Sequence, residues 1–218
     1  MLYLADQRAA SRVGCRGPPG LFAVTDTPSN FTPPPTPAPA QNHANLSALT
    51  VGFLTILHDA NGALGGYLVT NAWGRPLEFR LSTAVQPNRV QQILYGPTLT
   101  EYLHADLIGK TLVEKTGAQP TLIVTDSIPA LALRNKLDVP MVAIRPDDLD
   151  LSAADVIPLP HPRSSVLLVY SARHAMDRSR LEEILERVDP AVDLAEPFSR
   201  IREAVGEARK MGVTNRAA

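Results

Sequence analysis

The sequence predicts an α/β fold with a mixed sheet: a three-stranded antiparallel meander, then a parallel βαβ unit, then C-terminal helices. Three observations support this order. Three strand-like segments separated by short turns fill residues 48–83. After Pro87 the apolar pattern changes from period two to the spacing of a helix. Two short apolar segments with little polar alternation, residues 120–126 and 139–144, then flank a short helical segment, as parallel strands covered on both faces do.

The meander begins with residues 48–59, a continuous apolar run rich in strand-forming residues. Residues 65–71 form the second strand, and residues 77–83 alternate apolar and polar side chains, as a half-buried strand does. Gly62 and Gly74 supply the backbone freedom that the two tight turns require. We expect Trp73, beside the second turn, to pack as an anchor.

Two helices should follow, over residues 88–95 and 98–117. Thr98 and Glu101 have the spacing of a capping box. Leucines recur every four residues behind them, and Gly117 ends the pattern. His104 and Asp106 are two residues apart and therefore do not share a helix face, so we assign them to a solvated surface.

The βαβ unit comprises a strand after Pro120, a helix over residues 127–137 and a strand over residues 139–144. Asp126 and Ser127 stand at the carboxyl end of its first strand, where open α/β sheets bind ligands. Both residue types are also good helix N-caps, and a helix begins there, so capping is the favoured interpretation.

Residues 145–163 are acidic and rich in proline and are expected to form a loop, followed by one strand over residues 165–170. Two helices should end the domain. Ser179 caps the first, and the second runs from Glu196 to Gly212 with an apolar stripe opposite mixed charges. These C-terminal helices are the surface expected to dock a protein partner or a second copy.

Composition limits the function classes. We expect residues 1–47 to be a disordered, proline-rich leader, residues 48–212 a single α/β domain, and residues 213–218 a tail. No apolar run approaches the roughly eighteen residues of a membrane span, and no signal-type segment is seen, so we expect a cytoplasmic protein. The net charge of −1 does not indicate nucleic-acid binding. A single cysteine, Cys15, excludes a disulfide framework, and no cofactor fingerprint occurs.

The element order resembles the ribonuclease H-like fold over residues 48–144. Three local matches carry the resemblance: Leu122-Ile123-Val124-Thr125-Asp126-Ser127, Gly65-Gly66-Tyr67, and Asn88-Arg89-Val90-Gln91. They look like the fourth strand, the second strand and the start of the first helix of that family. The resemblance implies a two-metal Mg²⁺ site that cleaves phosphodiesters, in which carboxylates hold the ions because Mg²⁺ needs anionic oxygen ligands.

Carried over residue by residue, Asp126 takes the place of the fourth-strand aspartate, and Asp59 could stand for the first-strand aspartate. Gln91 replaces the family's metal-binding glutamate, and Glu101 could substitute for it from the next helix. The neutral amide favours a non-catalytic interaction or scaffold module without a cofactor. The alternative is a divergent nuclease or phosphotransfer enzyme that uses Asp59, Asp126 and Glu101 with Mg²⁺ or Mn²⁺. A third hypothesis is small-ligand binding at the carboxyl ends of the two parallel strands.

Overall fold

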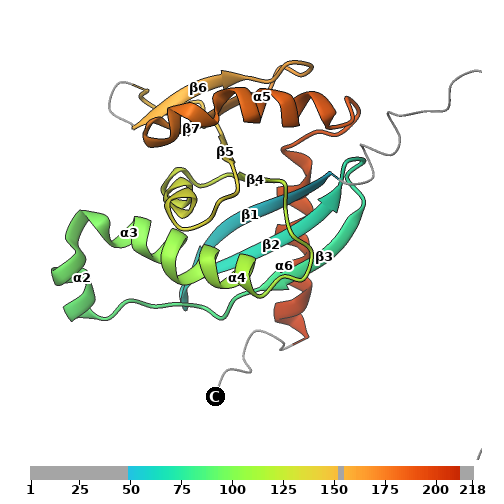
Figure 1. The fold of residues 1–218 in the computed structure, drawn as a ribbon. Helices are drawn as coiled ribbons and strands as arrows, with labels where there is room; N and C mark the ends of the chain where they lie inside the picture. The colour runs from blue at the N-terminus through green and yellow to red at the C-terminus, as the bar shows by residue number, and fades with distance from the viewer. Residues whose placement is uncertain (1–48, 152–154, 212–218) are drawn as a thin grey trace, which may run out of the picture. The chain divides into compact units, whose positions relative to one another are not determined.

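The computed structural model describes residues 49–151 and 155–211 of the 218-residue chain. Within this part of the chain, seven strands form one sheet with helices on both faces (Figure 1). The strands are β1 (Thr50–Asp59), β2 (Gly62–Asn71), β3 (Pro76–Leu81), β4 (Leu122–Thr125), β5 (Met141–Ile144), β6 (Val156–Pro160) and β7 (Leu167–Ser171). The α-helices are α2 (Arg89–Tyr95), α3 (Leu99–Glu101), α4 (Lys110–Glu114), α5 (Arg178–Arg187) and α6 (Glu196–Lys210). The predicted leader, residues 1–47, and tail, residues 213–218, lie outside the described residues.

Shorter helical elements complete the described part. A π-helical segment, Tyr102–Gly109, joins α3 to α4, so that residues 99–114 form one continuous helical run, here called the long helix. The 3₁₀ segments are Gly96–Thr98, Ile128–Asn135 and Ala172–Asp177. None of the helices in the described ranges is long and apolar enough to cross a bilayer.

The strand order in the sheet is β3-β2-β1-β4-β5-β7-β6. β1 pairs antiparallel with β2 and parallel with β4, and β5 lies parallel to β4. The meander and the βαβ unit therefore share one mixed sheet, which confirms the predicted fold class. Gly62, with φ of 112°, closes the turn between β1 and β2 as predicted.

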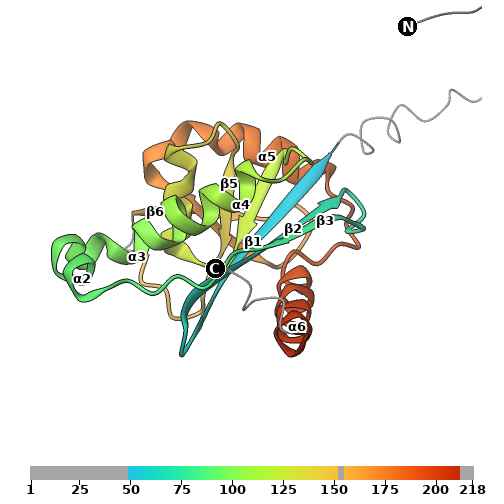
Figure 2. The ribbon, with the colours of Figure 1, turned by 90° about the horizontal axis from the view of Figure 1, so that it is seen from below.

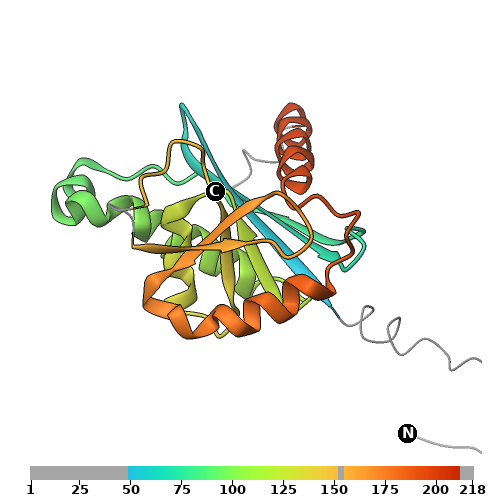
Figure 3. The same ribbon diagram turned by 90° about the horizontal axis from the view of Figure 1, so that it is seen from above.

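Each face of the sheet has its own apolar core. α5 and α6 cover one face, where Phe53 of β1 meets Phe198 of α6 with ring centroids 5.8 Å apart. The long helix and the 3₁₀ segment Ile128–Asn135 cover the other face. Figure 2 shows α4 and α6 on opposite sides of β1, and Figure 3 shows α5 and α6 over different parts of the sheet. Burial on both faces explains why the first three residues of β4, Leu122–Val124, are apolar and all four are buried.

Two adjacent glycines of β2 allow the helices on both faces to approach the sheet. A Cβ atom built on Gly65 would collide with Ile108 of the long helix, and one on Gly66 would collide with Ile201 of α6. Side chains alternate between the faces of a strand, so each glycine opens one face. The Gly65-Gly66 pair is therefore a packing requirement of this fold.

The segment 145–163 is not the loop that the sequence suggested. It contains β6, an edge strand that pairs antiparallel with β7. The sequence did not predict this strand because it contains two prolines, Pro158 and Pro160. Proline cannot donate a hydrogen bond to a β-ladder and is tolerated in strands mainly at a sheet edge.

Several expected local interactions also differ. Thr98 does not cap the long helix; its hydroxyl donates to the Tyr95 carbonyl oxygen instead. Ser179 lies inside α5 rather than at its N-cap, which is Asp177. Trp73 is 45% exposed and is not a buried anchor. The real capping box is at α2, where Asn88 and Gln91 bond each other's backbone N–H groups.

Candidate functional site at the carboxyl ends of the parallel strands

Asp126 lies directly after β4, at the carboxyl end of the parallel strands. The parallel register places Leu54 of β1 opposite Thr125, so Thr55 stands beside Asp126. The buried Thr55 hydroxyl donates a hydrogen bond of 2.8 Å to the Asp126 carboxylate. Arg202 of α6 forms an ion pair with the same carboxylate oxygen. Asp126 is thus tied to both β1 and α6.

Burial raises the pKa of Asp126 above its ordinary value, although the Thr55 hydrogen bond and the charge of Arg202 act in the opposite direction. The raised pKa means that the folded structure disfavours the charged form of the Asp126 carboxylate relative to water. The expected capping role is wrong, because neither side chain caps the following 3₁₀ segment: Ser127 stands at its N-cap position without a side-chain cap bond.

Asp59 lies in a different place. It is at the far end of β1, four residues beyond Thr55, which corresponds to about 13 Å along an extended strand. Its carboxylate pairs with Arg209 of α6 at 2.6 Å. β1 and β4 are neighbours, but β1 continues well past the end of β4, so the carboxyl ends of these two strands do not lie side by side. The structure does not bring Asp59 and Asp126 together.

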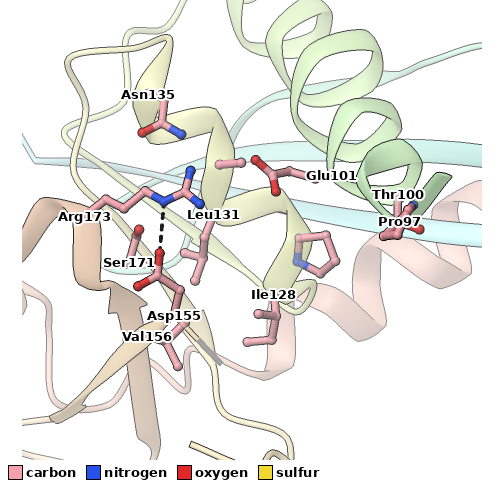
Figure 4. A pocket seen from close by; sticks show the side chains of 12 residues that line it. Pro97, Thr100, Glu101, Ile128, Leu131, Asn135, Asp155, Val156, Ser171 and Arg173 are labelled. Carbon is pink, nitrogen blue, oxygen red and sulfur yellow. Dashed lines mark hydrogen bonds and ion pairs between the residues drawn. The ribbon is translucent and has the colours of Figure 1, made fainter. Parts of the chain in front are cut away.

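Glu101 lies on the other side of the sheet, in the long helix. It lines a pocket of about 260 Å³ between that helix, the 3₁₀ segment Ile128–Asn135 and the β6 and β7 strands. Figure 4 shows the Glu101 carboxylate and the ion pair between Arg173 and Asp155 in this pocket, with the apolar side chains of Ile128 and Leu131 nearby. Glu101 therefore belongs to a different cavity from Asp126.

Gln91 is also remote from Asp126. It belongs to α2, whose residues are all at least partly exposed, and its side chain completes the capping box with Asn88. The helix that packs on the sheet is the long helix instead. The residue that it places next to the end of β4 is His104, whose Nδ1 lies 2.8 Å from the Ser127 hydroxyl oxygen.

The expectation that His104 lies on a solvated surface is wrong, because this residue is only 5% exposed. Burial, together with the nearby His58, lowers its pKa to about 4. The two imidazole rings are 5.2 Å apart, and the His104 Nε2 atom is buried without a hydrogen-bond partner among the described residues. His58 and Asp59 point to opposite faces of β1, as adjacent residues of a strand do.

A two-metal site does not fit this arrangement. In the described ranges, no three histidine, cysteine, aspartate or glutamate residues lie close enough to hold a metal ion. The two aspartates on the α6 face are each paired with an arginine, and an arginine competes directly with a cation for the carboxylate. The residues that the resemblance selected are therefore not arranged for Mg²⁺ chemistry in this structure.

The sequence analysis missed the partners of these aspartates. Arg202 and Arg209 are seven residues apart on α6 and so lie on nearly the same side of that helix. The spacing was visible, but only the position of α6 over β1 and β2 shows which acids these arginines meet.

Several solved structures align with part of this chain. No family model matches the sequence, and no curated protein matches it. Endonuclease V from Bacillus subtilis aligns with a TM-score of 0.44 at 12% identity, covering 73% of this chain and 83% of that one. A protein of unknown function from Archaeoglobus fulgidus aligns with a TM-score of 0.45 at 12% identity, covering 73% and 97%.

A third solved structure is Argonaute from Marinitoga piezophila in complex with a 5′ OH guide RNA. It aligns with a TM-score of 0.29 at 12% identity, and the match covers 70% of this chain but 28% of that one. All these TM-scores lie below 0.5, so the likenesses say nothing about activity.

Proposed function

We propose that this chain is a non-catalytic interaction module on a ribonuclease H-like framework. The observation that carries this proposal is the pairing of both aspartates with α6: Asp126 with Arg202, and Asp59 with Arg209. In this arrangement the acids fasten a helix to the sheet, whereas metal-dependent catalysis needs them grouped around a shared ion.

The contact surface that we propose is α2 rather than the C-terminal helices. α5 and α6 bury their apolar stripes within this chain. By contrast, α2 exposes Val90, Ile93 and Leu94, of which Leu94 is 77% exposed. These positions are i, i+3 and i+4 and form one apolar helix face. Figure 1 shows α2 at the end of the long helix, away from the sheet.

We propose a second copy of the chain as the occupant of this face. Arg89, at the start of α2, has no ion pair within the described residues. The apolar face of α2 can be covered by the same face of a second copy related by a twofold axis, as in an isologous contact. Three side chains provide much less than the roughly 800 Å² per partner of a stable dimer, so the dimer should be weak and concentration-dependent.

Two measurements test the proposal. Sedimentation at increasing concentration should show a monomer–dimer equilibrium that Leu94→Gln abolishes, while Met176→Gln, another strongly exposed apolar residue, leaves it unchanged. A monomer at all concentrations, or a dimer insensitive to Leu94→Gln, would refute the α2 contact. Incubation of the wild type with RNA or DNA and Mn²⁺ should give no cleavage beyond that of Asp126→Asn. Cleavage lost in Asp126→Asn would refute the non-catalytic assignment.

A further inference from the structure

A cavity of about 290 Å³ opens beside Asp126, at the carboxyl ends of β4 and β5. Its polar lining is formed by Asp126, Arg145 and Arg202, and its apolar lining includes Ile144, Pro146 and Phe198. A second hollow, of about 380 Å³, shares Ile144, Arg145 and Ala195 with the first and is also lined by Asp147. Arg145 therefore stands at the junction of two hollows.

Arg145 is the unusual member of this lining. Its backbone N–H donates a hydrogen bond of 2.8 Å to the Leu167 carbonyl oxygen. This bond holds the backbone of Arg145 at the end of the β5–β7 ladder. Its Nε atom is buried without a hydrogen-bond partner within the described ranges. A buried donor without a partner costs free energy, so the fold holds this guanidinium beside the cavity at a cost in stability.

The charges of the cavity favour an anion. Arg202 balances Asp126 through their ion pair, whereas Arg145 forms no ion pair within the described residues; Asp147 faces the second hollow rather than this cavity. A guanidinium presents its Nε–H together with a terminal N–H as a planar fork, and this fork matches two oxygens of a carboxylate or phosphate. The apolar wall of Ile144, Pro146 and Phe198 would contact a non-polar group attached to that anion.

We infer that this cavity binds a small organic anion, whose carboxylate or phosphate head group is held by the Arg145 fork and whose apolar part lies against Phe198. The position is the one where open α/β sheets bind ligands, beyond the carboxyl ends of parallel strands. Asp126 and Arg202 border the head group and keep α6 in place beside it. The inference concerns a different surface from α2, so it does not depend on self-association.

Calorimetric titration with four probes at matched ionic strength tests the site: inorganic phosphate, phenyl phosphate, acetate and benzoate. We expect saturable binding in which at least one aromatic anion binds more tightly than its small counterpart, and the two pairs distinguish phosphate from carboxylate as the head group. Arg145→Met should weaken binding about tenfold or more, because a bidentate charge-assisted contact is lost. Arg173→Met removes an exposed arginine outside the cavity and should change nothing.

A second readout needs no variant that could fail to fold. In the wild type, the NMR signal of the Arg145 Nε–H should shift on titration with the best probe, while that of Arg173 stays in place. Absence of saturable binding for all four probes would overturn the inference. Equal affinity for the aromatic and small anions would overturn its apolar part, and binding that survives in Arg145→Met would overturn the assignment of the fork.

Discussion

The Thr55 hydroxyl on β1 donates a hydrogen bond of 2.8 Å to the carboxylate of Asp126 at the end of β4. The bond joins the two strands at the position where the parallel ladder of β1 and β4 ends. Because Arg202 of α6 binds the same oxygen, one carboxylate connects two strands and a helix.

Replacing Asp126 by asparagine and by alanine should have different effects on the stability of the protein. In Asp126→Asn, the amide oxygen still accepts from Thr55 and the buried charge is removed, so the midpoint of thermal unfolding at neutral pH should be unchanged or higher. In Asp126→Ala, the buried Thr55 hydroxyl loses its acceptor, and the free energy of unfolding should fall by about 1–2 kcal/mol. Equal destabilisation by Asn and Ala, measured by denaturant titration, would contradict this account.

The close approach of α6 to β2 depends on Gly66. Gly66→Ala places a methyl group against Ile201 in the core and should lower the free energy of unfolding by about 1–3 kcal/mol. Gly206→Ala is the matched control: no atom lies within 4 Å of its added Cβ, and it sits inside α6. That variant should be more stable than the wild type by up to about 1 kcal/mol, because alanine favours helix over glycine. A stable Gly66→Ala protein would show that the helix can shift without cost.

The buried His104 predicts a pH dependence of stability. Its pKa is about 4 in the folded protein and about 6.5 when exposed, so between these values the unfolded chain binds more protons. The stability that comes from keeping His104 neutral is therefore fully present above pH 6.5 and is lost as the pH falls towards 4. The expected loss is on the order of 3 kcal/mol. His104→Asn, which can still bond Ser127, should flatten this part of the curve; an unchanged slope in that variant would assign the dependence to other groups.

The sequence was informative where patterns are local. The run of residues 48–59 and the apolar segment before Asp126 gave β1 and β4, and the glycine-led second strand was placed correctly. β6 was not predicted because its prolines are residues typical of loops. The π-helical segment was not predicted because its residues also suit an α-helix. These are cases in which tertiary position overrides local preference.

The candidate site shows the same limit. Asp126 was selected correctly as a residue at the carboxyl end of a buried strand, but the pairing register of β1 placed Thr55, not Asp59, beside it. Register depends on contacts far apart in the sequence, and so does the meeting of Arg202 with Asp126. Arg145 gave no sequence signal at all, because an arginine after a strand is common and only its buried Nε marks it.

The most direct test of the non-catalytic account is Mn²⁺ binding, followed through the paramagnetic broadening of backbone amide signals in the intact protein. With both aspartates paired to α6, the amides of Asp126, Thr55 and Asp59 should broaden no more than those around an exposed acid such as Glu183. Saturable broadening centred on Asp126, and abolished in Asp126→Asn, would show that the arginine gives way to a metal ion and would contradict the account.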